Sequence, residues 1–573
     1  MRLKKLTFAR NLMKRSTRRT VLKLTAIAGV FKRRELRQLF LIAICSVVIG
    51  LAVIYALPGE AQTSSSFCSR PPAGSVVTNP PEIQNSKAST PVNFTVLNIA
   101  PGQNCYLADG NLEAPTLRVT PSKKDLVLRL TNRLSGQSLP VSQQTLCVGG
   151  MAPPNSTSLH YHGLNISPTC HQDEVVKTVI KPNETFEFKL QIPKKEPPGL
   201  YWYHPHIHMQ SEEQVLSGLT GAIIVEGIKK YNKQAAKLPE RVFVLRDMKL
   251  LQEFPESDTE QPGKDISINS VPIRYQGGGK YDPPAVIQMQ PNQSQFWRVA
   301  NTAADSYFDL QVTYDNTPQQ LELVAMDGVP INVDGPKDKT LPVNHILLPP
   351  AGRAEFIING PGSAVKDAKF LTLKYDTKGD GNPQRTIARI DTQAQFTAAA
   401  LSTSAAESNV DENQVSGDRF SGLSQENSIQ QRTLFFSQTP PGAPKEEFYI
   451  TVKGNQPKVY DPNFKTPDIT VQEGTTEDWI VENHAPEAHA FHIHQIHFLV
   501  LQSPNSSEIG MLRDTINLPA WDGGNTPYPS VKLRMDFRGV KKDTSIAGTF
   551  VYHCHILEHE DGGMMAPIEV KSS

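Results

Sequence analysis

The segment HCHILEHEDGGM at residues 553–564 places a cysteine, three histidines and a methionine in one short stretch. In an extended strand, alternate side chains point to opposite faces, so His553 and His555 share one face and Cys554 points to the other. A thiolate, a histidine and a weak thioether are ligands of a mononuclear blue-copper electron-transfer centre, which needs one further histidine. This one backbone segment is therefore expected to supply two different metal sites.

Three other motifs supply the missing histidine and more: HYH at residues 160–162, HPH at 204–206 and HAFHIH at 489–494. In the last of these, His492 and His494 share a face and His489 falls on the other. One class, a complete blue-copper set, then contains His489, Cys554, His559 and Met564. The other class contains His160, His162, His204, His206, His492, His494, His553 and His555. Eight imidazoles are too many for one metal ion and enough for three.

Taken singly, these pieces have ordinary explanations. A His-x-His pair in a β-rich chain is more often a plain polar pair than a ligand pair, and a lone cysteine is more often a small buried hydrophobe. The grouping argues otherwise, because ten of the 15 histidines fall in the four motifs. The remaining five are interpreted as ordinary residues: His171, His208, His345, His484 and His497.

The four motifs resemble those of the multicopper oxidases in their order and internal spacing, and the resemblance covers residues 85–573. It implies that His489, Cys554 and His559 bind a type 1 copper, with Met564 as the axial ligand. It implies a type 2 copper on His160 and His492. The type 3 pair would be held by His162, His204, His206, His494, His553 and His555.

Two positions depart from the family pattern, and neither is a ligand. Ala490 stands where many members have proline, and Ile496 replaces a histidine that is common in plant and fungal relatives, which indicates a bacterial branch. The resemblance implies four copper ions and an oxidoreductase that reduces dioxygen to water. Electrons would come from a small-molecule or metal-ion donor.

The expected electron path enters at the type 1 copper, where His489 or His559 lies near the surface, and leaves through Cys554. Water formation also needs protons, and buried carboxylates are the obvious carriers. Asp173 and Glu560 stand near the motifs and are the predicted proton relays. The alternative is that either acid is only a structural hydrogen-bond partner.

Three functions stay open for the donor. The first is laccase-like oxidation of phenols and aromatic amines, the second oxidation of ferrous or cuprous ions, and the third a copper-free structural homologue. The third predicts lost ligands, and none is lost. A cuprous oxidase often has a methionine-rich insert, yet no methionine lies between Met326 and Met511, whereas a ferrous site needs only a few acids near His489. We therefore favour the laccase-like function.

The composition predicts an all-β fold, with 45 prolines, 37 glycines and short apolar runs. These runs are DLVLRL (125–130), FEFKL (186–190), GAIIVEG (221–227) and HFLVL (497–501). The resemblance implies three cupredoxin-like, Greek-key β-sandwich domains at residues 85–235, 240–395 and 433–573. The motifs of the first and third domains would meet at their interface, and the middle domain would form a wall of the substrate surface. Residues 396–432 are predicted to be a flexible linker.

Residues 1–61 are predicted to be a basic leader with a signal or membrane-spanning helix. Residues 1–38 contain 13 Lys or Arg and one acid, and residues 39–57 are 19 uncharged residues. As a helix these would span about 28 Å at roughly 1.5 Å per residue, enough for a bilayer core. The basic flank places the rest of the chain in the periplasm or at the outer face of the plasma membrane.

Two features of the leader leave its processing open. Residues 17–23 (TRRTVLK) resemble a twin-arginine export signal, and Gly59-Glu60-Ala61 is a small-x-small pattern that a signal peptidase accepts. Retention of residues 39–57 as a membrane anchor is the alternative to cleavage.

Charge and cysteines agree with an exported protein that binds no nucleic acid. The chain carries +1 and residues 1–38 contribute +12, so the remainder carries −11, the wrong sign for a polyanion. Cys68, Cys105, Cys147 and Cys170 allow two disulfides in any of three pairings. We favour Cys147–Cys170, which would fix the loop carrying the HYH motif.

Overall fold

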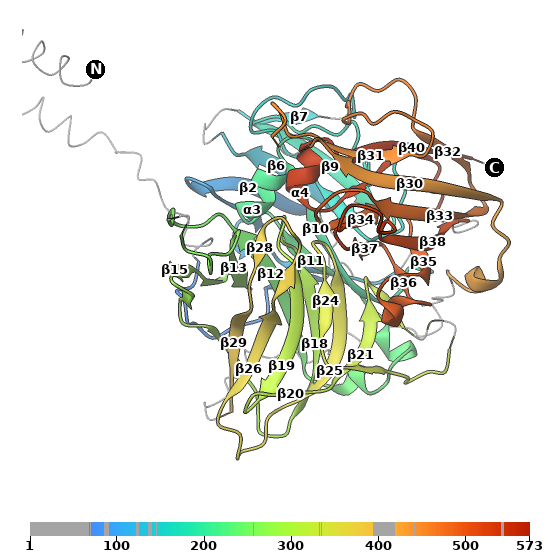
Figure 1. The fold of residues 1–573 in the computed structure, drawn as a ribbon. Helices are drawn as coiled ribbons and strands as arrows, with labels where there is room; N and C mark the ends of the chain where they lie inside the picture. Colours follow the sequence, from blue (N-terminus) through green and yellow to red (C-terminus); the bar gives the residue numbers. More distant parts are fainter. Residues whose placement is uncertain are drawn as a thin grey trace, which may run out of the picture. The chain divides into compact units, whose positions relative to one another are not determined.

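Strands dominate the chain, which confirms the all-β prediction (Figure 1). The computed structural model describes residues 68, 70–84, 91–121, 125–135, 140–144, 146–255, 257–331, 333, 335–392, 419–440, 442–539 and 544–572. The predicted leader and membrane segment lie outside these residues. Within the described ranges, no helix combines the length and the apolar character needed to cross a membrane.

The first two sheets enclose one core, to which Phe94, Leu128 and Tyr203 contribute. Their strand orders are β1-β5-β11-β10-β8 and β4-β3-β2-β6-β9-β7. The strands are β1 Glu82–Gln84, β2 Val92–Ala100, β3 Gln103–Ala108, β4 Leu112–Glu113, β5 Thr116–Val119, β6 Leu126–Arg133, β7 Ser142–Gln144, β8 His160–His162, β9 Glu184–Leu190, β10 Gly199–His204 and β11 Gly221–Val225. In β6 every second residue is buried, the period expected of a strand with one face on a core.

The middle pair of sheets follows the same plan around Trp297, Phe356 and Phe370. The orders are β14-β13-β12-β18-β25-β21-β22, with β23 on β21, and β17-β29-β26-β19-β20, with β24 on β19. The strands are β12 Glu240–Met248, β13 Asp265–Ile268, β14 Val271–Ile273, β15 Tyr275–Gly277, β16 Lys280–Tyr281, β17 Ala285–Gln288, β18 Ser294–Asn301, β19 Phe308–Tyr314, β20 Thr317–Pro318, β21 Leu321–Met326, β22 Val329–Pro330, β23 Leu341–Val343, β24 Ile346–Leu348, β25 Arg353–Asn359, β26 Ala368–Leu373, β27 Tyr375–Asp376, β28 Gly381–Asn382 and β29 Arg385–Asp391.

The last pair of sheets has the orders β31-β30-β33-β38-β35-β36 and β32-β40-β39-β34-β37. The strands are β30 Gln430–Gln438, β31 Phe448–Val452, β32 Ile469–Gln472, β33 Thr475–Asn483, β34 His489–Ile493, β35 Phe498–Gln502, β36 Leu512–Arg513, β37 Thr515–Leu518, β38 Ser530–Phe537, β39 Gly548–Cys554 and β40 Met565–Lys571. Trp479, Phe491 and Phe550 belong to their common core. The four apolar runs singled out in the sequence fall on β6, β9, β11 and β35, as predicted.

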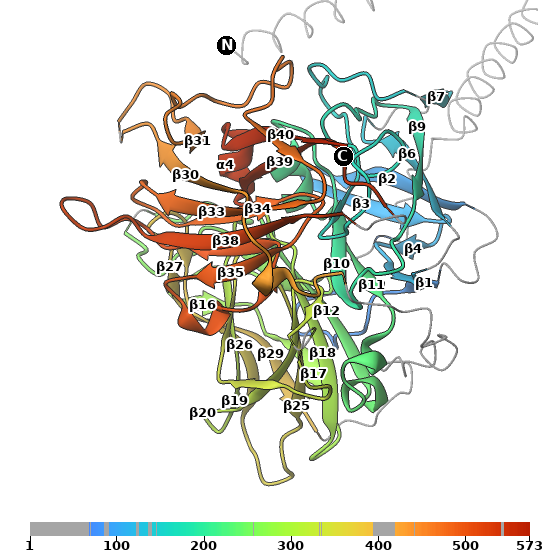
Figure 2. The same ribbon diagram turned by 90° about the vertical axis from the view of Figure 1, so that its right-hand side faces the viewer.

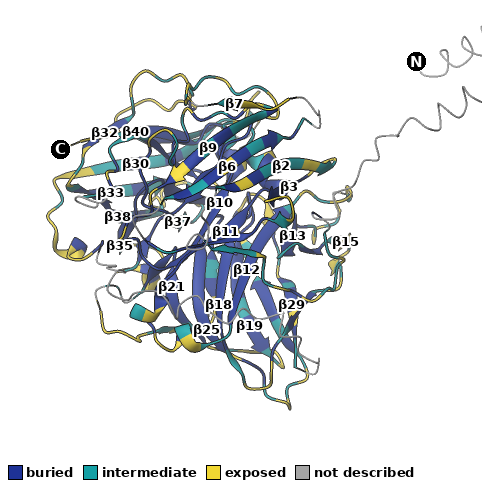
Figure 3. Cartoon of the chain, turned by 180° about the vertical axis from the view of Figure 1, so that it is seen from behind, coloured by how far each residue is buried: buried dark blue, intermediate teal, exposed yellow. Residues whose placement is uncertain are grey.

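Helices are short in the described part of the chain. They are α3 Ser211–Leu216, α4 Leu557–Asp561 and the 3-10 turns η3 Ile228–Lys230, η4 Ala235–Lys237, η7 Leu423–Gln425 and η8 Ser506–Glu508. Buried residues concentrate in the strands and exposed ones in the connecting loops (Figure 3).

The first and last pairs of sheets lie side by side, with the middle pair next to both (Figure 2). One buried arginine links all three: Arg353 at the start of β25 donates to both carboxylate oxygens of Asp514, at 2.7 and 2.6 Å, and to the carbonyl oxygen of Leu200, at 3.2 Å. A charge-assisted, two-point contact of this kind fixes orientation as well as distance. The middle domain therefore helps to set the interface between the other two.

Part of the predicted linker is packed rather than flexible. Residues 419–432 contain the turn η7 and the first residues of β30, and the side chains of Phe420 and Leu423 are buried. These two residues pack with Leu499 and Leu512 in a small apolar cluster. Two apolar anchors are enough to hold a segment whose average composition is polar. The earlier linker residues, 396–418, lie outside the described part of the chain.

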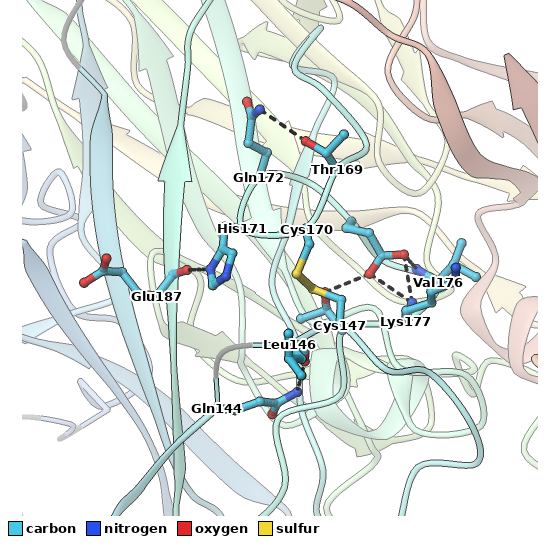
Figure 4. The surroundings of a disulfide bond; sticks show 12 residues. Gln144, Leu146, Cys147, Thr169, Cys170, His171, Gln172, Val176, Lys177 and Glu187 are labelled. Carbon is cyan, nitrogen blue, oxygen red and sulfur yellow. Dashed lines mark hydrogen bonds between the residues drawn. A yellow bond between two sulfur atoms is a disulfide. The ribbon is translucent and has the colours of Figure 1, made fainter. Parts of the chain in front are cut away.

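Two disulfides join the four predicted cysteines. The favoured Cys147–Cys170 pair is confirmed (Figure 4). Cys68 pairs with Cys105. Next to the Cys147–Cys170 disulfide, Gly149 N donates to the carbonyl oxygen of Lys177 at 2.9 Å. The segment that precedes the HYH motif is thereby held at two points.

Candidate metal centre

The cysteine side of β39 carries three potential ligands. Cys554 Sγ lies 3.6 Å from His489 Nδ1 and 3.7 Å from His559 Nδ1, and these two nitrogen atoms are 3.0 Å apart. His489 begins β34 and His559 lies in α4, so two strands and one helical turn position the set. Burial raises the pKa of the Cys554 thiol to about 12. A metal ion that binds here must therefore displace a proton to gain a thiolate ligand.

Met564 is held next to this set by its backbone. Cys554 N donates to the carbonyl oxygen of Met564 at 3.1 Å, and Met564 N donates to that of His559 at 2.9 Å. The Met564 side chain is fully buried in the same core as Cys554. Its predicted role as axial ligand remains a prediction.

The eight histidines of the second class form one buried cluster between the first and third pairs of sheets. His160 pairs with His204 across β8 and β10, and His492 pairs with His553 across β34 and β39. Across the interface, the rings of His160 and His494 stack at 3.9 Å. Three donor nitrogen atoms of His206, His494 and His553 also gather within 4.8 Å of one another. The structure thus brings together the residues that strand parity groups.

The nitrogen atoms of this cluster suit bound cations. His494 Nε2 and His206 Nε2 lie 3.1 and 3.5 Å from His553 Nε2. Burial lowers the pKa of His204 to about 3 and that of His206 to about 4, which leaves both imidazoles neutral near pH 7. Buried nitrogen atoms with no protein partner are His160 Nε2, His162 Nδ1, His204 Nε2, His492 Nε2, His494 Nδ1 and both of His555. Neutral imidazoles with buried, unshared lone pairs fit copper ions.

Asp173 contacts the histidine cluster as a fully buried carboxylate. Its Oδ1 lies 3.0 Å from His160 Nδ1 and accepts from Tyr161 N at 3.1 Å, while Oδ2 accepts from Gln495 Nε2 at 2.6 Å. Because Asp173 contacts Nδ1 of His160, Nε2 of this histidine is left for a metal ion. Metal-binding histidines commonly contact a carboxylate through their second ring nitrogen in this way. Burial raises the pKa of Asp173 well above the usual range of a carboxyl group.

Glu560 contacts the cluster from the other side. Its carboxylate lies 3.0 Å from His553 Nδ1 and 3.7 Å from His206 Nε2. Burial opposes ionisation, but these two histidines hold the pKa of Glu560 well below its usual range. Both predicted acids therefore touch predicted copper ligands. Their roles as proton relays remain predictions.

Two charged residues next to the cluster carry no sequence signal. Asp514 Oδ1 lies 3.3 Å from His162 Nε2, and the carbonyl oxygen of Asp514 lies 2.9 Å from His492 Nδ1. The second charged residue is Arg353, which donates to both carboxylate oxygens of Asp514. Neither residue falls in a histidine motif, and each meets the cluster only because separate domains pack together. Covariation between the two positions would be the signal to look for.

Some of the histidines set aside have structural roles. His497 is buried, 2.9 Å from the carbonyl oxygen of Asp327 and 3.5 Å from Asp514 Oδ2. His345 and His484 pair with Asp309 and Glu482 at 2.6 and 2.8 Å. His171 Nδ1 lies 2.6 Å from the carbonyl oxygen of Glu187, and His208 lines a cavity.

The comparisons with known proteins point in one direction. Two family models described as multicopper oxidase match residues 150–230 and 438–573. Among curated proteins, the multicopper oxidase mco of Staphylococcus aureus is 24% identical and the alignment covers 81% of this chain and 83% of that protein. The laccase of Bacillus subtilis strain 168 is 23% identical, with 73% and 85% covered.

Solved structures show the same cupredoxin-like fold. A multicopper oxidase from Campylobacter jejuni, described as a metallo-oxidase, has a TM-score of 0.59 and 23% identity, with 88% of this chain and 96% of that chain covered. McoA from Aquifex aeolicus has a TM-score of 0.61 and 17% identity, with 87% and 99% covered. The two family-model matches contain all four histidine motifs, and the family models, the curated relatives and the solved structures together support a multicopper oxidase, a copper-dependent oxidoreductase that uses dioxygen.

Proposed function

We propose that this oxidase takes single electrons from a small donor at the Cys554 side of β39 and reduces dioxygen to water at the histidine cluster. The carrying observation is the shared strand: Cys554 faces His489 and His559, and its neighbour His553 faces His206 and His494. Four copper ions, one at the first site and three at the second, would supply one-electron redox steps and dioxygen binding. The twelve residues assigned from the motifs would hold them.

The backbone of residues 553–555 gives the two sites a short covalent connection. Cys554 pairs with Phe491 and His553 with His492 in register, and His555 N donates to the carbonyl oxygen of Ala490 at 2.7 Å. These bonds fix the orientation of all three side chains. The protein thereby holds donor and acceptor sites at a constant separation.

The donor would approach at His559. His489 is fully buried, whereas His559 retains slight exposure, and Glu487 Oε2 lies 3.7 Å from His559 Nε2. A turn of the middle domain positions this acid, since Ala488 N donates to the carbonyl oxygen of Thr377 at 2.8 Å. A phenol or aromatic amine that contacts the His559 edge has in Glu487 an acceptor for its proton. This supports the laccase-like function.

A metal-oxidase function has its own supporting observation. Burial raises the pKa of Glu487, and the negative charges of Glu446, Glu558 and Asp380 raise it further. Several carboxylates near one histidine edge attract a cation, and oxygen ligands suit ferrous ions better than cuprous ions. Ferrous oxidation is therefore the second candidate.

The Glu487→Gln variant separates these two functions. Steady-state assays would compare a phenol, ferrous ion and cuprous ion under matched conditions, with exposed Asp376→Asn as the control. Laccase-like function predicts that the variant loses phenol oxidation chiefly at pH values well below the phenol pKa of about 10, where the phenol is protonated and must give its proton to a base. The parent enzyme could instead show a much higher kcat/KM for ferrous ion than for the phenol. If this preference is lost in the variant and at high ionic strength, the laccase-like function is rejected.

We further propose an extracytoplasmic location, in the periplasm or at the outer face of the plasma membrane. Two disulfides among the described residues suit an oxidising compartment. Cell fractionation with N-terminal sequencing of the mature protein tests both the location and the fate of residues 39–57. Recovery of the enzyme from the cytoplasm with reduced cysteines would contradict this proposal.

A further inference from the structure

A cavity of about 340 Å³ connects one of the cluster histidines with exposed side chains. The inner residue is His206, and apolar side chains such as Val175 and Val551 line the cavity beside it. Two methionines also line it, Met151 and Met209, with 65% and 63% of their surfaces exposed. A thioether this exposed contributes little to a core.

The backbone at Met209 adds a second observation. Its φ is +66°, in the left-handed region that non-glycine residues rarely adopt. Three residues further along, Glu212 N donates to Asp561 Oδ2 at 2.9 Å, which ties this segment to the acid next to Glu560. The chain thus holds an exposed, apolar side chain in an unfavourable backbone conformation. Such strain commonly marks a functional position.

The two methionine segments are tied to each other. Gln210 Nε2 donates to the carbonyl oxygen of Pro153 at 3.3 Å, which links the segment of Met209 to that of Met151. The Cys147–Cys170 disulfide anchors the chain four residues before Met151 (Figure 4). Val176, which is labelled in the same view, lines the same cavity. These contacts hold both thioether-bearing segments at one cavity.

His208 completes a soft set of donors in this cavity. Its ring packs edge-to-face against Tyr460 at 5.0 Å, and its Nδ1 is buried with no protein partner. Thioethers and imidazole bind cuprous ion well, whereas cupric and ferrous ions prefer nitrogen and oxygen ligands. Glu213, an acidic residue, lines the same cavity.

We propose that Met151, Met209 and His208 bind a cuprous ion at the outer part of this cavity, from which copper reaches His206 during assembly of the cluster. The site is separate from the twelve predicted ligands and from the donor edge at His559. The inference rests on the copper assignment of the cluster and is independent of the identity of the electron donor.

Binding is tested on the copper-loaded, full-length protein with silver ion, a redox-inert analogue of cuprous ion. With methionine methyl groups labelled with carbon-13, silver should shift two NMR signals, which Met151→Leu and Met209→Leu identify by their absence. Met248→Leu, at a different cavity, is the matched control and should leave both shifts unchanged. Silver that shifts neither signal, or shifts others alone, overturns the proposal.

The role in assembly is tested on copper-free, full-length protein. Copper content is followed by atomic absorption during uptake from cuprous ion buffered by a chelator, and separately from cupric ion. The Met151→Leu/Met209→Leu variant should take up cuprous copper about tenfold more slowly, in the range typical for loss of a metal-site contact, while cupric uptake and the final content stay unchanged. Uptake of cuprous copper at the parental rate rejects the entry role, whatever donor the enzyme oxidises.

Discussion

The two faces of β39 hold their side chains by different means. On the Cys554 face, aromatic packing dominates: Phe448 stacks on His559 at 4.3 Å and Phe436 lies 4.9 Å from His489. On the opposite face, buried carboxylates contact the histidines, as Asp173 does with His160. Packing gives a rigid apolar shell, while carboxylates supply charge and proton acceptors. Under the proposed function, an apolar shell would suit the site that transfers electrons, and carboxylates would suit the cluster that needs protons to form water.

Removal of the thiolate breaks the Cys554 face outright. Cys554→Ser should abolish both the blue colour and turnover, because serine cannot replace a soft, delocalising thiolate. Visible absorption and oxygen consumption measure the two effects. Copper content of the histidine cluster should persist, since its ligands lie on the other face. Full oxidase activity in this variant would reject the whole assignment.

Loss of a carboxylate should break the opposite face selectively. Asp514→Asn removes the charged contact to His162 and leaves Arg353 with a weaker partner, so copper affinity of the cluster should fall about 10–100-fold. The blue absorption should remain and serves as the control for folding. Copper analysis against a graded chelator series gives the affinity. A variant that loses its blue colour first would contradict the separation of the two faces.

Glu560→Gln is expected to affect the histidine face kinetically. The amide keeps the size of the side chain next to His553 but cannot carry a proton. Stopped-flow measurements should show slower dioxygen reduction and an unchanged rate of reduction of the blue centre. A solvent isotope effect that grows in the variant would sharpen the proton-relay assignment. Equal slowing of both steps would indicate a structural role alone.

A smaller effect concerns pH and the copper-free protein. Burial lowers the pKa of His204 and His559 to about 3 and that of His206 to about 4, below the unfolded value of about 6.5. Below that value the unfolded chain binds more protons, so stability present at pH 7 is lost as the pH falls toward 4.

Each such histidine contributes at most about 1.4 kcal/mol per pH unit. Thermal unfolding of copper-free protein between pH 7 and pH 4.5 measures the loss. Copper-loaded protein should resist it in the upper part of that range, because bound ions compete with protons. A copper-free protein whose Tm is constant across the range would contradict this expectation.

The part of the site that the sequence predicts is the part that depends on the alternation of side chains along one strand. Strand parity sorts Cys554 from His553 whatever the rest of the fold does, and the structure brings the residues together in those two groups. The contact between Arg353 and Asp514 has no such local cause, because it forms only when separate domains pack. The packing of residues 419–432 was missed for a related reason: Phe420 and Leu423 act through partners distant in sequence.

The register between β34 and β39 has a consequence for how this protein tolerates change in length. Phe491 lies opposite Cys554 and His492 opposite His553. A slip of one residue in either strand would turn every side chain to the other face, so the thiol would enter the imidazole cluster. Insertions between domains leave this pairing intact, whereas a single deletion inside residues 489–494 exchanges the two sites. Evolution of this family is therefore expected to vary its loops freely and to keep these few positions free of gaps.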